Sequence, residues 1–338
     1  MKISAYLSEK IKILSFLLTI MIVILHSNMS MLSTGYISFF QLAITAEVTR
    51  VAVPLFFLIS GFLFFINHNG TLEDYKRKLL SRTHSILIPY IFFLLSGSLI
   101  MFVIRQPYNL SAFIEIIKNG ILNYPPVFYP LWFLRDLYII VLFSPLVYLI
   151  VKKTPIFIPL LFLIWILGIH LGFYIPSIDS VFFFVLGAFF SIKQKIPEKA
   201  NSKYAYISLV VWITLCFFNI YIKEHVTQLP SATHRIIILL GIYSIWTFYD
   251  KLYPKFSERI KIAPIYKYSF LIYLIHEPIL TIIKKSGLYI LGRSSYTIGL
   301  IYVIAPLLTI WIIYIIGCKL NTYFPSFLSF ITGGRVKR

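Results

Sequence analysis

Long apolar stretches separated by short polar connections run along the whole chain. Each is close to the roughly 20 residues with which an α-helix crosses the hydrocarbon core of a bilayer. Only helices and closed barrels satisfy their backbone hydrogen bonds inside lipid, and the runs are too long for single strands. We therefore predict an all-α integral membrane protein, a bundle of about ten transmembrane helices at residues 13–31, 45–67, 84–104, 131–151, 155–173, 178–192, 205–222, 234–250, 267–284 and 297–318.

Composition supports this class. Of the 338 residues, 59% are hydrophobic and 13% are charged, whereas a soluble domain carries roughly a quarter charged residues. The polar connections are too short to hold a separate soluble domain. We therefore predict one polytopic domain over residues 1–338.

The net charge of +19 reflects how the chain is oriented in the membrane. With the N-terminus inside, most of the 31 lysines and arginines fall on inner segments, as the positive-inside rule requires. This predicts that both termini are cytoplasmic and that the basic segments face the lipid bilayer. A nucleic-acid partner is not predicted.

Several polar side chains lie inside the predicted helices. Because polar groups are costly in lipid, they should face a shared interior or a wet cavity. Glu47 and Arg50 are three residues apart and could pair on one helix face. An ion-pair network that only fixes helix packing is the alternative for any one pair. At one outer-to-middle depth lie His26, Glu47, Arg50, Trp132, Arg135, Asp136, His276 and Glu277.

This set favours a functional cavity. Histidine suits proton transfer near neutral pH, so His26 is the first candidate for chemistry. Interior cations suit anionic or strongly polar ligands, and Trp132 offers a stacking face for a sugar. No spacing of His, Cys, Asp and Glu predicts a metal site, and there is no glycine-rich phosphate loop or nucleophile elbow.

Five stretches together resemble one known family. They are IVILHS (22–27), RVAVPLFFLISGFLF (50–64), PLWFLRDLYIIVLFSPL (130–146), FFFVLGAFF (182–190) and SFLIYLIHEPIL (269–280). In this order they resemble the acyltransferase 3 family of bacterial integral-membrane O-acyltransferases that modify polysaccharides. The resemblance implies a ten-helix bundle in the bacterial cytoplasmic membrane. It also implies transfer of an acyl group, commonly acetyl, from cytoplasmic acyl-CoA to a hydroxyl of a glycan or lipid-linked sugar, with no permanently bound cofactor.

The resemblance also implies roles for particular residues. His26 matches the family's catalytic histidine, and Arg50, Arg135 and the His276–Glu277 pair match positions that shape the donor or acceptor site. Two positions depart from the pattern, because Ser15 and Ser85 stand where the family carries arginines. For the donor we therefore expect nearby cations to act, namely Lys12, Lys78 and Arg82.

We expect His26 to act as a general base on the acceptor hydroxyl, and a transient acyl-histidine is a variant. Arg50 and Arg135 would stabilise negative charge, while Glu47, Asp136 and Glu277 orient their partners. A transporter or flippase for a lipid-linked or anionic solute would use the same polar cavity and is the rival hypothesis. A catalytically inactive relative is a third.

Overall fold

The computed structural model describes residues 3–104, 109–125, 127–154, 156–169, 172, 175–194, 196, 198–225, 231–260 and 264–336. Every regular element in these ranges is helical, so the prediction of an all-α protein is confirmed for the described part of the chain. The helices are α1 (Ala5–His26), α2 (Gly35–Leu42), α3 (Ala52–Phe65), α4 (Leu72–Arg82), α5 (Ile88–Ile104), α6 (Leu110–Leu122), α7 (Trp132–Leu142), α8 (Ser144–Lys153), α9 (Phe157–Leu167), α10 (Ile178–Ile192), α11 (Ala205–His225), α12 (Ser231–Ile260), α13 (Ser269–Leu291), α14 (Ser295–Tyr323) and α15 (Pro325–Ile331).

Short 3-10 and π-helical turns join several of these helices. They are η1 (Ser30–Leu32), η2 (Ala43–Glu47), η3 (Val48–Val51), η4 (Thr83–Leu87), η5 (Tyr129–Leu131), η6 (Ser202–Tyr204) and η7 (Pro264–Tyr268). Of these, η2 and η4 are π-turns, which often mark functional sites inside longer helices.

Six helical segments in the described residues are long and apolar enough to cross a membrane. A seventh results if α7 and α8, which meet at a bend of 61°, form one broken span. The stretches predicted at 155–173 and 178–192 hold the shorter apolar helices α9 and α10, of 11 and 15 residues. These helices support a multi-pass membrane protein, whereas about ten crossings and cytoplasmic termini stay predictions.

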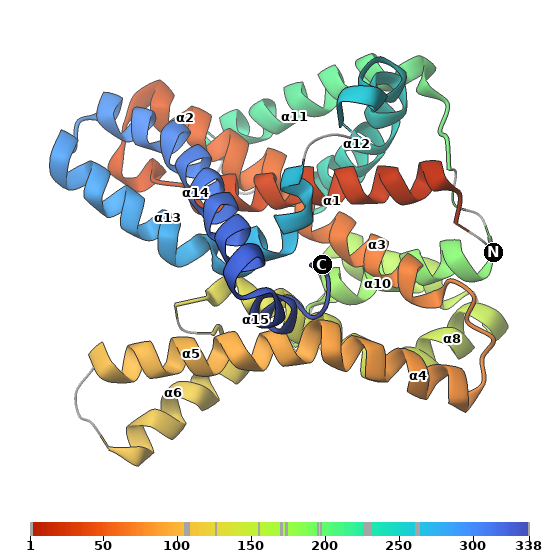
Figure 1. Cartoon of the computed structure of the whole chain (residues 1–338). Coiled ribbons are helices and arrows are strands. Elements are labelled where there is room, and N and C mark those ends of the chain that lie inside the picture. The colour runs from red at the N-terminus through yellow and green to blue at the C-terminus, as the bar shows by residue number, and fades with distance from the viewer. Residues whose placement is uncertain are drawn as a thin grey trace.

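Helix α1 runs through the middle of the bundle and packs on α3, α13 and α14 (Figure 1). Helices α13 and α14 form one adjacent pair, and α11 and α12 form another. Two of the helices that pack on α1, α13 and α14, therefore lie far from it in sequence.

Helices α3 and α10 are in close backbone contact. A Cβ atom on Gly61 would lie 2.1 Å from the carbonyl oxygen of Phe184, and one on Gly187 would lie 2.0 Å from that of Leu58. Only glycine fits at such distances, and small residues are the usual means of close helix packing in membranes. Residues of α3 also line both cavities described below.

Candidate functional site

His26 is the last residue of α1 and is held by side chains from two other elements. A hydrogen bond joins its Nδ1 to the hydroxyl of Tyr129 on η5, and the two rings meet edge to face at 4.8 Å. On its other side, the ring of His276 on α13 stacks at 5.2 Å with an interplanar angle of 30°. The ammonium of Lys284, also on α13, donates to the His26 carbonyl oxygen at 2.6 Å. That carbonyl lies at a helix C-terminus, where a cation is stabilising.

His276 is fully buried and its tautomer follows from its contacts. Its Nδ1 lies 2.8 Å from the carbonyl oxygen of Tyr273 and 3.1 Å from that of Ile272, and carbonyls only accept, so Nδ1 carries a proton. Its Nε2 and one carboxylate oxygen of Glu277 are buried without a partner among the described residues. Buried unpaired polar atoms are costly, which makes the His276 ring that stacks on His26 a candidate part of the site.

A cavity of about 380 Å³ opens beside His26, and we call it the histidine cavity. Arg50 lines it with an exposed side chain, and its guanidinium makes no hydrogen bond or ion pair with the described residues. The remaining lining includes Trp132 and Tyr124, whose flat rings suit a sugar face. His26, Arg50 and Trp132 therefore meet at one site.

Glu47 does not pair with Arg50. Its carboxylate instead accepts from Nδ2 of Asn219 at 2.8 Å and from Lys223 at 2.6 Å, and it pairs with Nδ1 of His234 at 2.7 Å. The expected pairing fails because the π-turn η2 ends at Glu47 and the tighter turn η3 follows. The backbone of Glu47, with φ of −125° and ψ of −67°, departs from helical values, so Glu47 and Arg50 are not on one face of a continuous α-helix. The carboxylate fastens α11 and α12 to this irregular segment.

Arg135 and Asp136 are buried and line neither cavity described here. Nη1 of Arg135 donates to the carbonyls of Ile121 and Asn123 at 2.7 and 2.6 Å, and its Nε donates to Asp136 at 3.0 Å. Asp136 also accepts from the backbone of Ser177 at 3.1 Å. The pair fixes the end of α6 and the start of α10 against α7. This matches the alternative hypothesis of an ion pair that only fixes helix packing.

A second cavity of about 540 Å³, which we call the basic cavity, shares Phe133 and Tyr273 with the histidine cavity. No carboxylate is among the described residues that line it. Four cations and four small hydroxyl side chains do line it, namely Lys12, Arg82, Lys267, Arg335, Ser15, Thr19, Ser60 and Ser269. A hollow with this lining suits an anionic ligand.

A family model for an acyltransferase domain matches residues 9–333. The chain belongs to the acyltransferase 3 family. It is therefore an acyltransferase, and its long apolar helices make it a membrane enzyme. It is also similar to the succinoglycan biosynthesis protein ExoH of Rhizobium meliloti (strain 1021), with 23% identity over 321 residues that cover 89% of this chain and 84% of ExoH. No solved structure matches.

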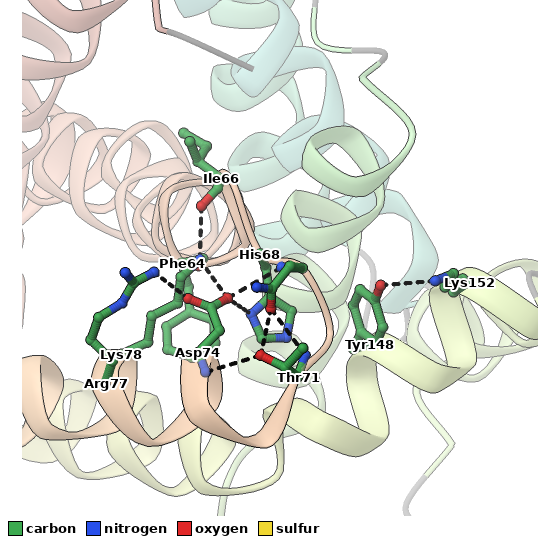
Figure 2. Close-up of polar contacts among 10 residues, drawn as sticks. Phe64, Ile66, His68, Thr71, Asp74, Arg77, Lys78, Tyr148 and Lys152 are labelled. Atoms are coloured by element: carbon green, nitrogen blue, oxygen red, sulfur yellow. Dashed lines mark hydrogen bonds and ion pairs between the residues drawn. The ribbon is translucent and has the colours of Figure 1, made fainter.

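Among the donor residues expected for this acyltransferase, Lys12 and Arg82 line the basic cavity but Lys78 does not. Figure 2 shows the ammonium of Lys78 directed at the end of α3, where it donates to the carbonyls of Phe64 and Ile66 at 2.7 Å each. It is also 3.9 Å from the carboxylate of Asp74. Lys78 therefore caps a helix.

Sequence reasoning missed two residues that form hydrogen bonds with His26. Tyr129 carries no charge and lies in an aromatic, proline-rich connection, so nothing in the sequence marked its hydroxyl. Lys284 is the last residue of the stretch predicted at 267–284, and nothing there indicated a partner, but it lies within α13 and donates to the His26 carbonyl. The described residues contain no group of three or more His, Cys, Asp or Glu that could hold a metal ion.

Proposed function

We propose that this acyltransferase moves an acyl group, acetyl in the simplest case, from cytoplasmic acyl-CoA to a hydroxyl of a cell-surface polysaccharide or lipid-linked glycan. The family supports the reaction class, and the name of ExoH supports a polysaccharide acceptor. In this proposal the chain crosses the cytoplasmic membrane of a bacterium about ten times, with both termini inside.

The observation that carries the proposal is that His26 and Arg50 line the same cavity and that Tyr129 is hydrogen-bonded to the histidine. When Nδ1 of His26 donates to the Tyr129 oxygen, Nε2 carries the lone pair and is the basic atom. A hydrogen bond on one ring nitrogen sets the role of the other in this way. His26 is then prepared to act as a general base.

The proposed step conserves all atoms and charges. Nε2 of His26 takes the proton of the acceptor hydroxyl while the oxygen of that hydroxyl attacks the thioester carbonyl carbon. A new C–O bond forms, the C–S bond breaks, and the departing coenzyme sulfur receives a proton from His26. Negative charge develops on the carbonyl oxygen during the attack, and the guanidinium of Arg50, which pairs with none of the described residues, stabilises it.

The two cavities suit the two substrates. The histidine cavity offers the aromatic faces of Trp132 and Tyr124 to a glycan, and the basic cavity offers cations to the phosphates of acyl-CoA. Because Phe133 and Tyr273 line both, the donor's acyl end would meet the acceptor at these two rings.

The test is His26→Ala, with the exposed His225→Ala as the matched control. Mass analysis of the cell-surface glycan should show that the acyl increment disappears in the first variant and persists in the second. A wild-type increment in His26→Ala would refute the proposed role. Purified wild-type protein should be thermally stabilised by acetyl-CoA, which a flippase would not bind.

A further inference from the structure

The C-terminal tail after α15 has a fixed conformation. Gly333 and Gly334 adopt φ of +60° and +76°, and their backbone N–H groups donate to the carbonyls of Phe330 and Ser329 at 3.1 and 2.8 Å. Such left-handed turns reverse the chain at a helix end. Beyond the turn, Val336 is buried at 2% exposure, so the tail is anchored on both sides of Arg335.

The tail crosses the backbone of the π-turn η4 at close range. A Cβ atom on Gly333 would lie 2.5 Å from Cα of Ser85. Nη1 of Arg335 donates to the carbonyl of Ser85 and, at 3.1 Å, to that of Thr332. The guanidinium carbon also lies 3.7 Å from the ring centroid of Phe270. A side chain stacked and bonded in this way is held in place before any ligand binds.

Arg335 faces the basic cavity, which it shares with Arg82, Lys12 and Lys267. Arg335 is an exposed residue, and it lines this cavity. Several cations around one hollow repel each other, and no carboxylate among the described lining residues offsets them. A ligand with several phosphate charges would offset this repulsion, and the planar guanidinium can bind a phosphate through two N–H groups.

We propose that Arg335 completes the donor site from the C-terminal tail and binds a phosphate of the nucleotide end of acyl-CoA. The inference rests on the proposed function, because it takes acyl-CoA as the donor. The inference assigns a binding role to Arg335. This cation lies beside Ser85, whose side chain carries no charge.

The test is CoA binding to purified full-length protein in detergent without added phospholipid, measured by titration calorimetry. Losing a charge-assisted hydrogen bond should raise the Kd of Arg335→Gln about tenfold or more, and Arg335→Lys should lie in between. The control is Arg293→Gln, an exposed arginine between α13 and α14 that lines neither cavity. Its Kd should equal that of the wild type.

A second pair of variants tests the position of the tail while Arg335 keeps its charge. Gly333→Ala and Gly334→Ala impose the same left-handed strain, but only Gly333→Ala also collides with Ser85, since a Cβ on Gly334 meets nothing within 4 Å. We expect weaker CoA binding in Gly333→Ala than in Gly334→Ala. Equal affinities for the pair would contradict the inference.

The outcomes separate this inference from the proposed function. If wild-type protein and Arg335→Gln bind CoA equally, the inference is wrong and acyl-CoA remains the donor. If the wild type does not bind CoA, the donor assignment fails and the inference fails with it. Phosphatidylglycerol vesicles offer similar phosphate chemistry. If Arg335→Gln loses binding to them but not to CoA, the site belongs to a lipid headgroup and the inference is overturned.

Discussion

The Tyr129→Phe variant removes the hydroxyl that contacts His26 and keeps the ring that packs against it. Its only lost contact with the histidine is one hydrogen bond between neutral groups. Such a bond contributes about 0.5–1.5 kcal/mol net, which corresponds to roughly a two- to twelvefold change in rate. Removing the base itself, in His26→Ala, should cost a factor of roughly 10²–10⁴.

The two substitutions together test whether Tyr129 acts through His26. A double-mutant cycle measures acetyl transfer from acetyl-CoA to purified acceptor glycan for the wild type, both single variants and the double variant. If the hydroxyl only orients the imidazole, Tyr129→Phe should have no further effect once His26 is alanine. The kcat of Tyr129→Phe should fall while the KM for acetyl-CoA stays constant.

Fully multiplicative losses in this cycle would refute the reasoning, because they would mean that Tyr129 acts on the substrate independently of His26. The same holds if Tyr129→Phe has wild-type kcat, since the hydrogen bond would then have no role in setting the tautomer. Thermal melts of all four proteins serve as the control for folding.

Further predictions concern packing and the donor site. Gly187→Ala should lower the unfolding temperature in a detergent melt, because its new Cβ would collide with a backbone oxygen at 2.0 Å and overpacking costs about 1–3 kcal/mol. Gly287→Ala should melt close to the wild type, because its nearest neighbour is the side chain of Ile301 at 3.1 Å, which can move. Arg82→Gln should raise the KM for acetyl-CoA, whereas Lys78→Ala should leave it unchanged in steady-state kinetics, because Lys78 binds helix carbonyls outside the basic cavity. A raised KM in Lys78→Ala would contradict this assignment.

Much of the fold could be predicted from the sequence, because every segment that crosses lipid must satisfy its backbone hydrogen bonds internally. Apolar runs near 20 residues predict helices, and the helices are there. The number of membrane crossings is harder to predict from the sequence, because α9 and α10 are short and α7 and α8 meet at a bend. The hydropathy of a stretch does not reveal where a helix stops or turns.

The candidate site was predictable only in its outline. The topology predicted a common depth for His26, Arg50 and His276, and these residues do gather near one cavity. Their partners could not be predicted, because pairing depends on local pitch and on contacts between distant segments. The π-turn before Arg50 turns Glu47 toward α11 and α12, and Arg135 closes a loop rather than facing the cavity.

The lining of the basic cavity has a consequence for how the protein is made. Its lining includes Lys12 and Ser15 from α1 and Arg335 from the segment that follows α15. Chains are synthesised from the N-terminus, so early helices can assemble while this cavity still lacks a side. The cavity can be complete only after Arg335 has left the ribosome. A chain that is terminated before Arg335 can therefore insert its early helices but cannot form the whole cavity.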